Sequence, residues 1–402
     1  MKRLLSMLLW AAISFSAVSC SLIELEFPWS KGDEYVNSST GIPTDKAASE
    51  NPSPVVAEEE KTFNMPTSIS PLSTDPDNKN ICRFNLAGIN ANGEWLELFG
   101  TGEENQNVWL KINGVEKGVK VYNGDDIATR AISRAKADVV FLVDNSGSMS
   151  EEANKVAEEI IRWSEKLSQT MDVQFGCVGI DHEYINGAIN ITDVNTLSEY
   201  LNVYTGVDRT QHYGEKMATP PADLETMKFK ARAYNDAGGE CGGIMLQFAD
   251  QNFTFRENAN RFYVYFTDEP NQPGGNSWWS VLAVDSSSEY YMWSSSKGVI
   301  YTVFSDSGSN PENWTNWLVK ENPYLFSTYT GGTTIATGSE FNISLDELPI
   351  TGAITQSFVF AFNTSNEMVP GKKYDVDITI YYSEGSIASH QVYEDIEFLS
   401  AE

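Results

Sequence analysis

Residues 138–149 read DVVFLVDNSGSM, in which the uninterrupted apolar run of residues 139–143 is followed directly by a short polar turn. A continuous run rich in β-branched and aromatic residues predicts a strand that is buried on both faces of a mostly parallel sheet. Beyond the turn, apolar residues from Met149 to Leu167 recur at spacings of three and four, which is typical of a helix with one buried face. The stretch therefore predicts the first strand and helix of an α/β fold.

The alternation of strand and helix continues over residues 135–327. Short apolar segments predict further strands, and Pro311 opens a last candidate helix that extends to Leu318. Alternating units of this kind imply a doubly wound, mostly parallel sheet, whose ligand site lies beyond the carboxyl ends of its strands. The further candidate strands lie at residues 173–180, 261–267 and 299–305.

The flanks of this segment, residues 81–134 and 328–402, consist of short alternating runs separated by turn residues, which is typical of antiparallel strands. Each flank offers too few strands for a core of its own, so we expect both to build one β-sandwich into which the α/β segment is inserted. Two small separate β-domains flanking it are the alternative. The candidate strands lie at residues 95–99, 108–112, 119–122, 341–345, 357–362 and 374–382.

The N-terminus is typical of an exported protein. Residues 1–19 place two basic residues before an apolar run that is shorter than the roughly 20 residues of a membrane span, which indicates a signal peptide. The sequence Ala-Val-Ser-Cys ending at Cys20 resembles a bacterial lipobox, and this resemblance implies a lipidated Cys20 on the outer membrane or cell surface. Ordinary cleavage at the same bond, giving a secreted or periplasmic protein, is the alternative. Residues 20–80 hold seven of the chain's fifteen prolines and predict a disordered tether.

Composition excludes several functions. A formal charge of −29 repels phosphates and anionic lipids, so we expect no nucleic-acid partner and no membrane contact other than an N-terminal lipid. Three histidines and four cysteines are too few for a His-rich metal tract or a disulfide framework, although a bond between Cys177 and Cys241 stays open. The signatures of zinc proteases, P-loops and serine hydrolases are missing, so we expect no enzyme.

A cluster of oxygen ligands follows the first predicted strand. Asp144, Ser146 and Ser148 present a carboxylate and two hydroxyls at the strand end, and oxygen ligands suit a hard cation such as Mg²⁺, Ca²⁺ or Mn²⁺. The pattern D-x-S-x-S resembles the metal-ion-dependent adhesion site of von Willebrand factor A (VWA) domains. That resemblance implies that Asp268, which follows another apolar strand, completes the site.

The second loop of the site resembles the glutamate branch of that family, seen in integrin β subunits. Residues 235–246 read NDAGGECGGIML, and the resemblance assigns Glu240 where most VWA domains carry threonine. The proline that precedes the glutamate in this branch is missing here. In the family a partner's carboxylate takes the remaining coordination position, so the resemblance implies a protein partner that presents a carboxylate.

Further acids near the motif predict a second metal site less specifically. Glu151 and Glu152 occupy positions where integrin β subunits bind an adjacent ion, but acids in a helix's first turn also offset the helix dipole. Asp181, Asn235 and Asp236 are the other candidates, and each is equally consistent with an acidic, solvated surface.

Trp278 and Trp279 follow Asp268 and are candidates either for a partner-binding rim or for the core. Taken together, these features favour a cell-surface, metal-dependent protein-binding module that acts in adhesion or assembly. A structural fimbrial or surface-assembly subunit, with a scaffolding VWA domain, is the alternative. A metal-dependent hydrolase is a more remote one.

Overall fold

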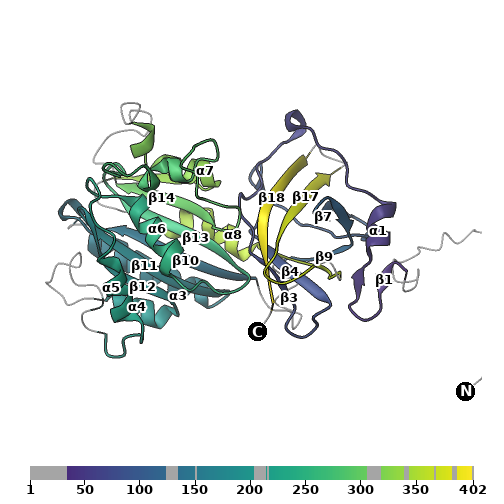
Figure 1. The fold of residues 1–402 in the computed structure, drawn as a ribbon, viewed down its shortest axis with the longest axis horizontal. Coiled ribbons are helices and arrows are strands. Elements are labelled where there is room, and N and C mark those ends of the chain that lie inside the picture. Colours follow the sequence, from purple (N-terminus) through teal and green to yellow (C-terminus); the bar gives the residue numbers. More distant parts are fainter. Residues whose placement is uncertain are drawn as a thin grey trace, which may run out of the picture.

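The computed structural model describes residues 34–123, 135–149, 152–202, 214, 217–305, 318–338, 344–365, 368–382 and 387–400. Two bodies lie side by side, an α/β body and a barrel-like body of strands that we call the β-body (Figure 1). The signal peptide, Cys20, Glu151, the helix predicted from Pro311 and most of the strand predicted at 341–345 lie outside the described residues.

The α/β body is built on a six-stranded sheet in the order β12-β11-β10-β13-β14-β15. Every neighbouring pair is parallel except β12, which runs antiparallel to β11 at one edge. The doubly wound, mostly parallel sheet predicted from the sequence is therefore confirmed. Its strands are β10 Lys136–Asp144, β11 Asp172–Asp181, β12 Tyr184–Thr192, β13 Ala259–Thr267, β14 Val299–Ser305 and β15 Thr334–Thr337.

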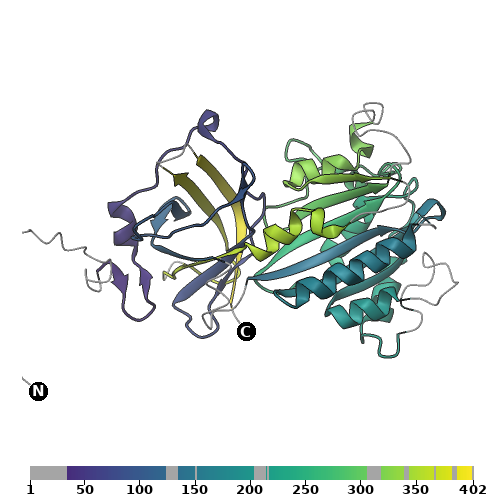
Figure 2. The ribbon, with the colours of Figure 1, turned by 180° about the vertical axis from the view of Figure 1, so that it is seen from behind.

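Alternate side chains of β10 enter two separate cores, one on each face of the sheet. Val139 and Phe141 pack against α3, α4 and α8, whereas Val140 and Leu142 pack against α5, α6 and α7. Figures 1 and 2 show these two helical layers from opposite sides. The helices are α3 Ala153–Ser168, α4 Val194–Leu201, α5 Leu224–Ala231, α6 Gly242–Asn252, α7 Tyr324–Thr330 and α8 Ile350–Thr355.

The β-body is one eight-stranded sheet in the order β8-β7-β17-β18-β3-β4-β16-β9, antiparallel except where β18 meets β3. It combines both flanks of the chain, because the chain leaves it after β9 and returns at β16, with the α/β body between. Its strands are β3 Leu72–Thr74, β4 Ile81–Leu86, β7 Val108–Ile112, β8 Val115–Lys117, β9 Val119–Tyr122, β16 Phe358–Asn363, β17 Lys373–Tyr382 and β18 Ile387–Leu399.

The segment predicted to be a disordered tether belongs to the β-body over its described part, residues 34–80, so that prediction is wrong there. It contains the helix α1 Asp45–Glu50 and the strand β3. Extended stretches between them bond to the barrel wall: the Ser53 hydroxyl donates to Thr379 at 2.9 Å, and the Tyr393 hydroxyl donates to the carbonyl of Pro66 at 2.8 Å. Proline and serine favour an extended chain, and here that extended chain finds partners on neighbouring strands.

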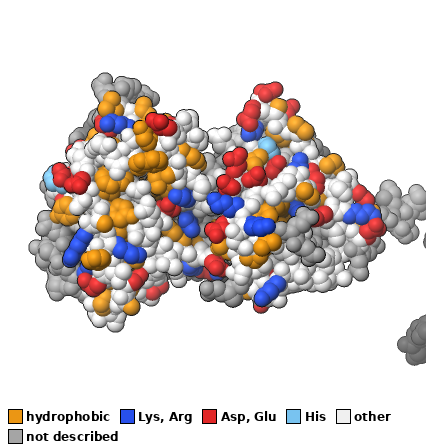
Figure 3. Space-filling model, in the orientation of Figure 1, with side chains coloured by type: hydrophobic (Ala, Val, Ile, Leu, Met, Phe, Trp, Pro, Cys, Tyr) orange, Lys and Arg blue, Asp and Glu red, His pale blue; other side chains and the backbone are white. Residues whose placement is uncertain are grey.

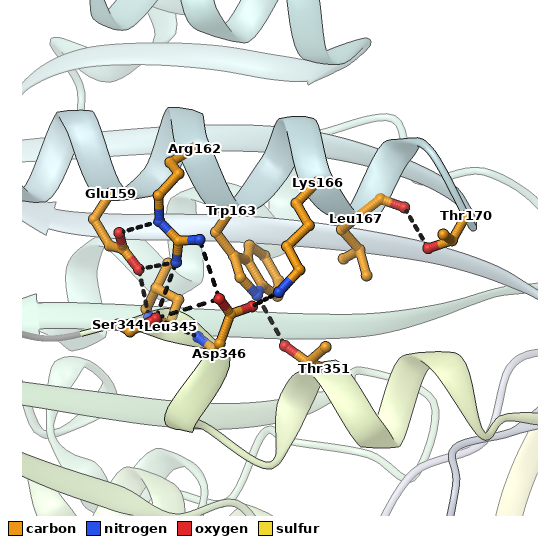
Figure 4. Close-up of polar contacts among 10 residues, drawn as sticks. All are labelled: Glu159, Arg162, Trp163, Lys166, Leu167, Thr170, Ser344, Leu345, Asp346 and Thr351. Atoms are coloured by element: carbon orange, nitrogen blue, oxygen red, sulfur yellow. Dashed lines mark hydrogen bonds and ion pairs between the residues drawn. The ribbon is translucent and has the colours of Figure 1, made fainter.

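The α/β body also reaches further along the chain than residue 327. The four residues of β15 pair with β14, and α8 packs beside α3 (Figure 2). Figure 4 shows how α3 holds α8 and the segment before it. Arg162 and Lys166 both contact Asp346 at 3.0 Å, and the indole N–H of Trp163 donates to Thr351 of α8 at 2.9 Å. Elements of four and six residues are too short for a periodic pattern, which explains the misplaced boundary.

The two bodies are joined directly as well as through the chain. The amide of Ile69 donates to the carbonyl of Ser295 at 2.9 Å, and the side chain of Asn258, just before β13, bonds to Ser73 of β3. Asn258 adopts a positive φ of 59°, which asparagine tolerates better than most residues. These contacts therefore hold the N-terminal end of β13 against the β-body. Within the described residues, no helix is long and apolar enough to cross a membrane.

Arg256 connects the N-terminal ends of the strands β10, β11 and β13. Its Nε contacts Asp138 Oδ1 at 2.7 Å, its Nη1 contacts Asp172, and its Nη2 donates to the carbonyl of Ala137 at 2.7 Å. Asp138 is fully buried, and this burial raises the pKa of its carboxyl group even though Arg256 lowers it. These contacts of Arg256 align the N-terminal ends of β10 and β11 with the start of β13. They lie at the opposite end of the strands from Asp144 and Asp268.

Phe360 and Phe84 should carry the joint core of the β-body. Both side chains are fully buried, and their rings stack with centroids 4.9 Å apart, although they come from opposite flanks of the chain. We expect Phe360→Ala to lower the free energy of unfolding by about 3–5 kcal/mol. Hydrogen exchange should show protection lost in β4 and β9 as well as in β16. Val115→Ala, at a side chain 56% exposed in β8, should change stability by less than about 0.5 kcal/mol. Loss of protection in β16 alone would contradict a single core.

Arg256→Gln should leave the buried Asp138 carboxylate without its cation, at a cost of about 3 kcal/mol in urea unfolding at pH 7. The folded-state pKa of Asp138 is already raised by burial, and removing Arg256 raises it further. The variant's loss of stability should therefore shrink as the pH falls and Asp138 becomes protonated in the folded state. Asp172→Asn is the matched control, because this more exposed partner should cost less than about 1 kcal/mol. Equal losses for both variants at pH 5 and pH 7 would contradict this account.

Candidate metal centre

The two aspartates of the predicted site lie at the same edge of the sheet. Asp144 is the last residue of β10, and Asp268 directly follows the last residue of β13. These strands are parallel neighbours in which Val143 pairs with Phe266, so both chains leave the sheet side by side. The carboxyl ends of parallel strands are where such sheets bind ligands.

Hydrogen bonds connect the motif residues into one chain. Asp144 Oδ1 accepts from the amide of Ser146 at 2.9 Å, and the hydroxyls of Ser146 and Ser148 lie 2.9 Å apart. The Ser148 hydroxyl donates to Asp268 Oδ1 at 3.1 Å. Thr267, at the end of β13, donates its hydroxyl to Asp144 Oδ2 at 3.1 Å. Four of the five predicted ligands are therefore brought together.

The carboxyl groups at this edge are costly to ionise. Burial raises the pKa of Asp144 to about 8, and the nearby Asp268 and Glu240 raise it too. Burial also raises the pKa values of Asp268 and Glu269. None of the ion pairs formed between described residues brings a Lys or Arg to these groups; the one basic side chain paired here is His182, whose Nδ1 lies 3.3 Å from Glu240 Oε1. Among the described residues, these carboxyl groups therefore have no permanently charged counter-ion.

Glu240 sits in the second loop, two residues before α6 begins. Its side chain is buried, with Oε2 accepting from Gln272 Nε2 at 3.2 Å and Oε1 facing His182. The backbone fixes the same loop, because the amide of Gln272 donates to the carbonyl of Glu240 at 3.0 Å. Glu240 thus lies close enough to influence the two aspartates but bonds to other partners.

The oxygen ligands of this cluster fit a hard cation, but the three carboxylates are not grouped around one point. Carboxylate and hydroxyl oxygens are the ligands that Mg²⁺ and Ca²⁺ prefer, and a cation would offset the cost of the buried Asp144 carboxylate. Ser148 is exposed, so the cluster opens to solvent. In the part of the chain that the structure describes, however, no three His, Cys, Asp or Glu side chains are grouped to hold one ion. The predicted convergence of Asp144, Glu240 and Asp268 is therefore not present in this arrangement.

The candidates for a second ion are spread along the same rim. Glu152 is buried just before α3, and Glu151 lies outside the described residues. Asp181 Oδ2 accepts from the Tyr184 hydroxyl at 3.2 Å, while Asn235 and Asp236 are exposed. A second ion among these residues stays a prediction.

The two tryptophans have different surroundings. Trp278 is 46% exposed and meets Tyr290 edge to face, with ring centroids 5.5 Å apart. Trp279 packs against the core around α6 and donates its indole N–H to Gln247 at 2.6 Å. Only Trp278 is therefore placed as a surface residue of the rim.

The cysteines do not form the disulfide that the sequence left open. Cys82, Cys177 and Cys241 are all free and buried. The Cys241 thiol donates to Asn271 Oδ1 at 3.2 Å, next to the start of α6. Cys241 therefore helps to fix the loop that carries Glu240.

Several residues of the site were not anticipated from the sequence. Thr267 and Glu269 flank Asp268, and a polar run directly after an apolar strand was a signal that could have included them. Gln272 and His182 hold the Glu240 carboxylate from two other loops. No local pattern connects these two residues to Glu240, because only the fold brings them together.

Comparisons with known proteins find only distant structural likenesses. No family model matches the chain, and no curated protein matches it in sequence. The solved structures that resemble it include the BatB protein of Bacteroides thetaiotaomicron, with 14% identity, a TM-score of 0.29, and coverage of 50% of this chain and 90% of that one. They also include the three N-terminal domains of the type V pili tip protein Mfa5 from Porphyromonas gingivalis, with 14% identity, a TM-score of 0.22, and coverage of 53% and 29%.

The human COPII-coat protein Sec24c is a further match, with 8% identity, a TM-score of 0.25, and coverage of 87% of this chain and 55% of that one. Identities and TM-scores this low carry no argument about the fold or the function of this chain. The parallel sheet with helices on both faces is itself consistent with a VWA-like domain.

Gly243 should be essential for the loop that carries Glu240. Its amide donates to Asn271 at 3.0 Å, and an added Cβ would overlap the carbonyl of Trp279. We expect Gly243→Ala to lower the free energy of unfolding by about 2 kcal/mol or more, because backbone must shift to accommodate the methyl group. Gly275→Ala on the same rim is the control, since no atom lies within 4 Å of its added Cβ. Urea unfolding of both variants checks this, and similar stabilities would contradict it.

Proposed function

We propose that the α/β body binds one divalent cation, Mg²⁺ or Ca²⁺ with Mn²⁺ as a further candidate, through Asp144, Ser146, Ser148 and Asp268. The observation that carries this proposal is the buried Asp144 carboxylate, which accepts from the Ser146 amide and has no Lys or Arg partner among the described residues. The hydroxyls of Ser146 and Ser148 continue this chain of hydrogen bonds to Asp268. Within a protein, a buried carboxylate is normally paired with a cation or a metal. Glu240 would supply a third carboxylate by exchanging Gln272 and His182 for the ion.

The bound ion would act as a Lewis acid that accepts a carboxylate from a partner protein. The protein's own residues prepare this surface: Thr267 and the Ser146 amide orient Asp144, and the exposed Ser148 leaves one side of the cluster open. The proposal contains no catalytic step. Together with the signal peptide and lipobox expected from the sequence, it describes an exported surface protein that uses the cation for adhesion or assembly.

A scaffolding role is the second candidate, and one observation favours it. Glu240 is held by Gln272 and His182, and the described part of the chain contains no group of three metal-ligating side chains. In a fimbrial or surface-assembly subunit, the same hydrogen bonds would serve only to hold together the loops at the carboxyl ends of the strands. The two candidates differ in whether a divalent ion changes the stability of the folded protein.

Divalent ions should stabilise the protein through Asp144. A ligand present at 100 times its Kd stabilises the folded state by about 2.7 kcal/mol, which corresponds to a rise in Tm of about 5 to 10 °C for the α/β body. We expect this rise on adding Mg²⁺ or Ca²⁺ to protein treated with EDTA, measured by calorimetry. Asp144→Ala should remove it while the protein remains folded.

Glu59→Ala serves as the control, because Glu59 is an exposed acid of the N-terminal segment, far along the chain from the site. This variant should keep the full effect of the ions. Identical Tm values with EDTA and with saturating Mg²⁺ or Ca²⁺ would reject the metal centre in favour of the scaffolding role.

A further inference from the structure

A pocket of about 690 Å³ lies beside the metal centre, between the turn that joins β11 to β12 and the helix α5. Ile185 and Ala231 contribute apolar surface to it, and both are buried. Asn186 and Asn235 add carboxamide groups. The pocket therefore has the mixed lining that is typical of a site for a small polar group.

The pocket and the metal centre share structural parts. Asn186 accepts a hydrogen bond from Asn145 Nδ2 at 3.3 Å, and Asn145 stands between Asp144 and Ser146 in the metal motif. On the other side, Asp181 lines the pocket and precedes His182, which contacts Glu240. A partner bound at the ion therefore lies next to this pocket.

The wall formed by α5 and Arg232, the residue directly after it, is basic, in contrast to a chain with 56 acidic and 27 basic residues. Lys228 and Arg232 both line the pocket. Within the described ranges, the exposed Arg232 forms no ion pair, and the ion pair of Lys228 is with the exposed Glu225, at 2.9 Å. Figure 3 shows Lys and Arg side chains over this end of the α/β body.

We propose that this pocket receives a second acidic side chain of the same partner that gives a carboxylate to the metal ion. The inference rests on the proposed function. The Arg232 guanidinium offers a planar pair of N–H donors that matches a carboxylate, and Lys228 adds a second positive charge. The Asp181 carboxylate, which already accepts from Tyr184, leaves an acceptor for a backbone N–H of the bound peptide. The occupant is thus an acidic peptide segment.

This assignment and a second metal ion at Asp181 and Asn235 exclude each other. Lys228 and Arg232 in the same wall repel a cation and attract an anion. A sulfate or the dianion of a phosphate monoester would meet the Asp181 carboxylate without offering it a donor. A peptide carboxylate offers both the negative charge and a neighbouring N–H.

The test uses two sets of fluorescent synthetic peptides in a Gly-Ser background, one with a single Glu and one with two Glu residues separated by one to six residues. Anisotropy with Mg²⁺ and with EDTA measures their affinities for the full chain. We expect the best two-Glu peptide to bind about tenfold more tightly than the one-Glu peptide in Mg²⁺. Arg232→Gln combined with Lys228→Gln should reduce this ratio to near one, and Lys230→Gln, on the same helix but outside the pocket, should preserve it.

The design separates the two proposals. Binding of the one-Glu peptide that does not depend on Mg²⁺ would reject the metal centre, whatever the ratio. A ratio near one in the unaltered protein, or a ratio that survives the double substitution, would overturn the pocket. The pocket would also be overturned if Lys230→Gln lowered the ratio as much, or if no two-Glu peptide bound at all.

Discussion

The parallel pairing of β10 with β13 is the constraint on which the rest of the structure depends. It places Val143 opposite Phe266, so that Asp144 and Asp268 leave the sheet together at one edge. At the other edge, Arg256 holds the starts of the same strands through the buried Asp138 and through Asp172. The charged groups thus lie at opposite ends of the same strands. Arg256 neutralises the carboxylates at the N-terminal ends, whereas no Lys or Arg among the described residues pairs with the carboxylates at the carboxyl ends.

The two cores explain why this edge can carry an unfavourable cluster. Side chains of β10 alternate between helices on both faces, so the central strands are fixed independently of the polar turn that follows them. The helix α3 starts just after the motif and is bound to the segment before α8 through Asp346. A rigid framework of this kind tolerates a buried carboxylate whose pKa is raised to about 8, and perturbed pKa values of that sort are common at functional sites.

The partners of the Glu240 carboxylate would differ between a metal centre and a scaffolding role. Its carboxylate has two neutral or weakly basic partners, Gln272 and His182, which a divalent ion could replace at modest cost. Close by, Lys228 and Arg232 give the rim a local positive wall on a strongly acidic protein. Under the two proposals, the rim joins a site for a cation to a pocket for an acidic side chain, and one acidic partner would occupy both.

The sequence by itself determined the fold class and three neighbouring residues of the candidate site, because periodicity and the spacing of Asp144, Ser146 and Ser148 are local properties. Asp268 was assigned through the resemblance to VWA domains. The sequence did not determine that residues 34–80 join the β-body or that β15 and α8 complete the α/β body, since such short or extended segments gain their structure from neighbours. Only the tertiary structure placed Gln272 and His182 on Glu240 and the basic wall of α5 beside the motif. These contacts join residues far apart in the chain, and no pattern of short range encodes them.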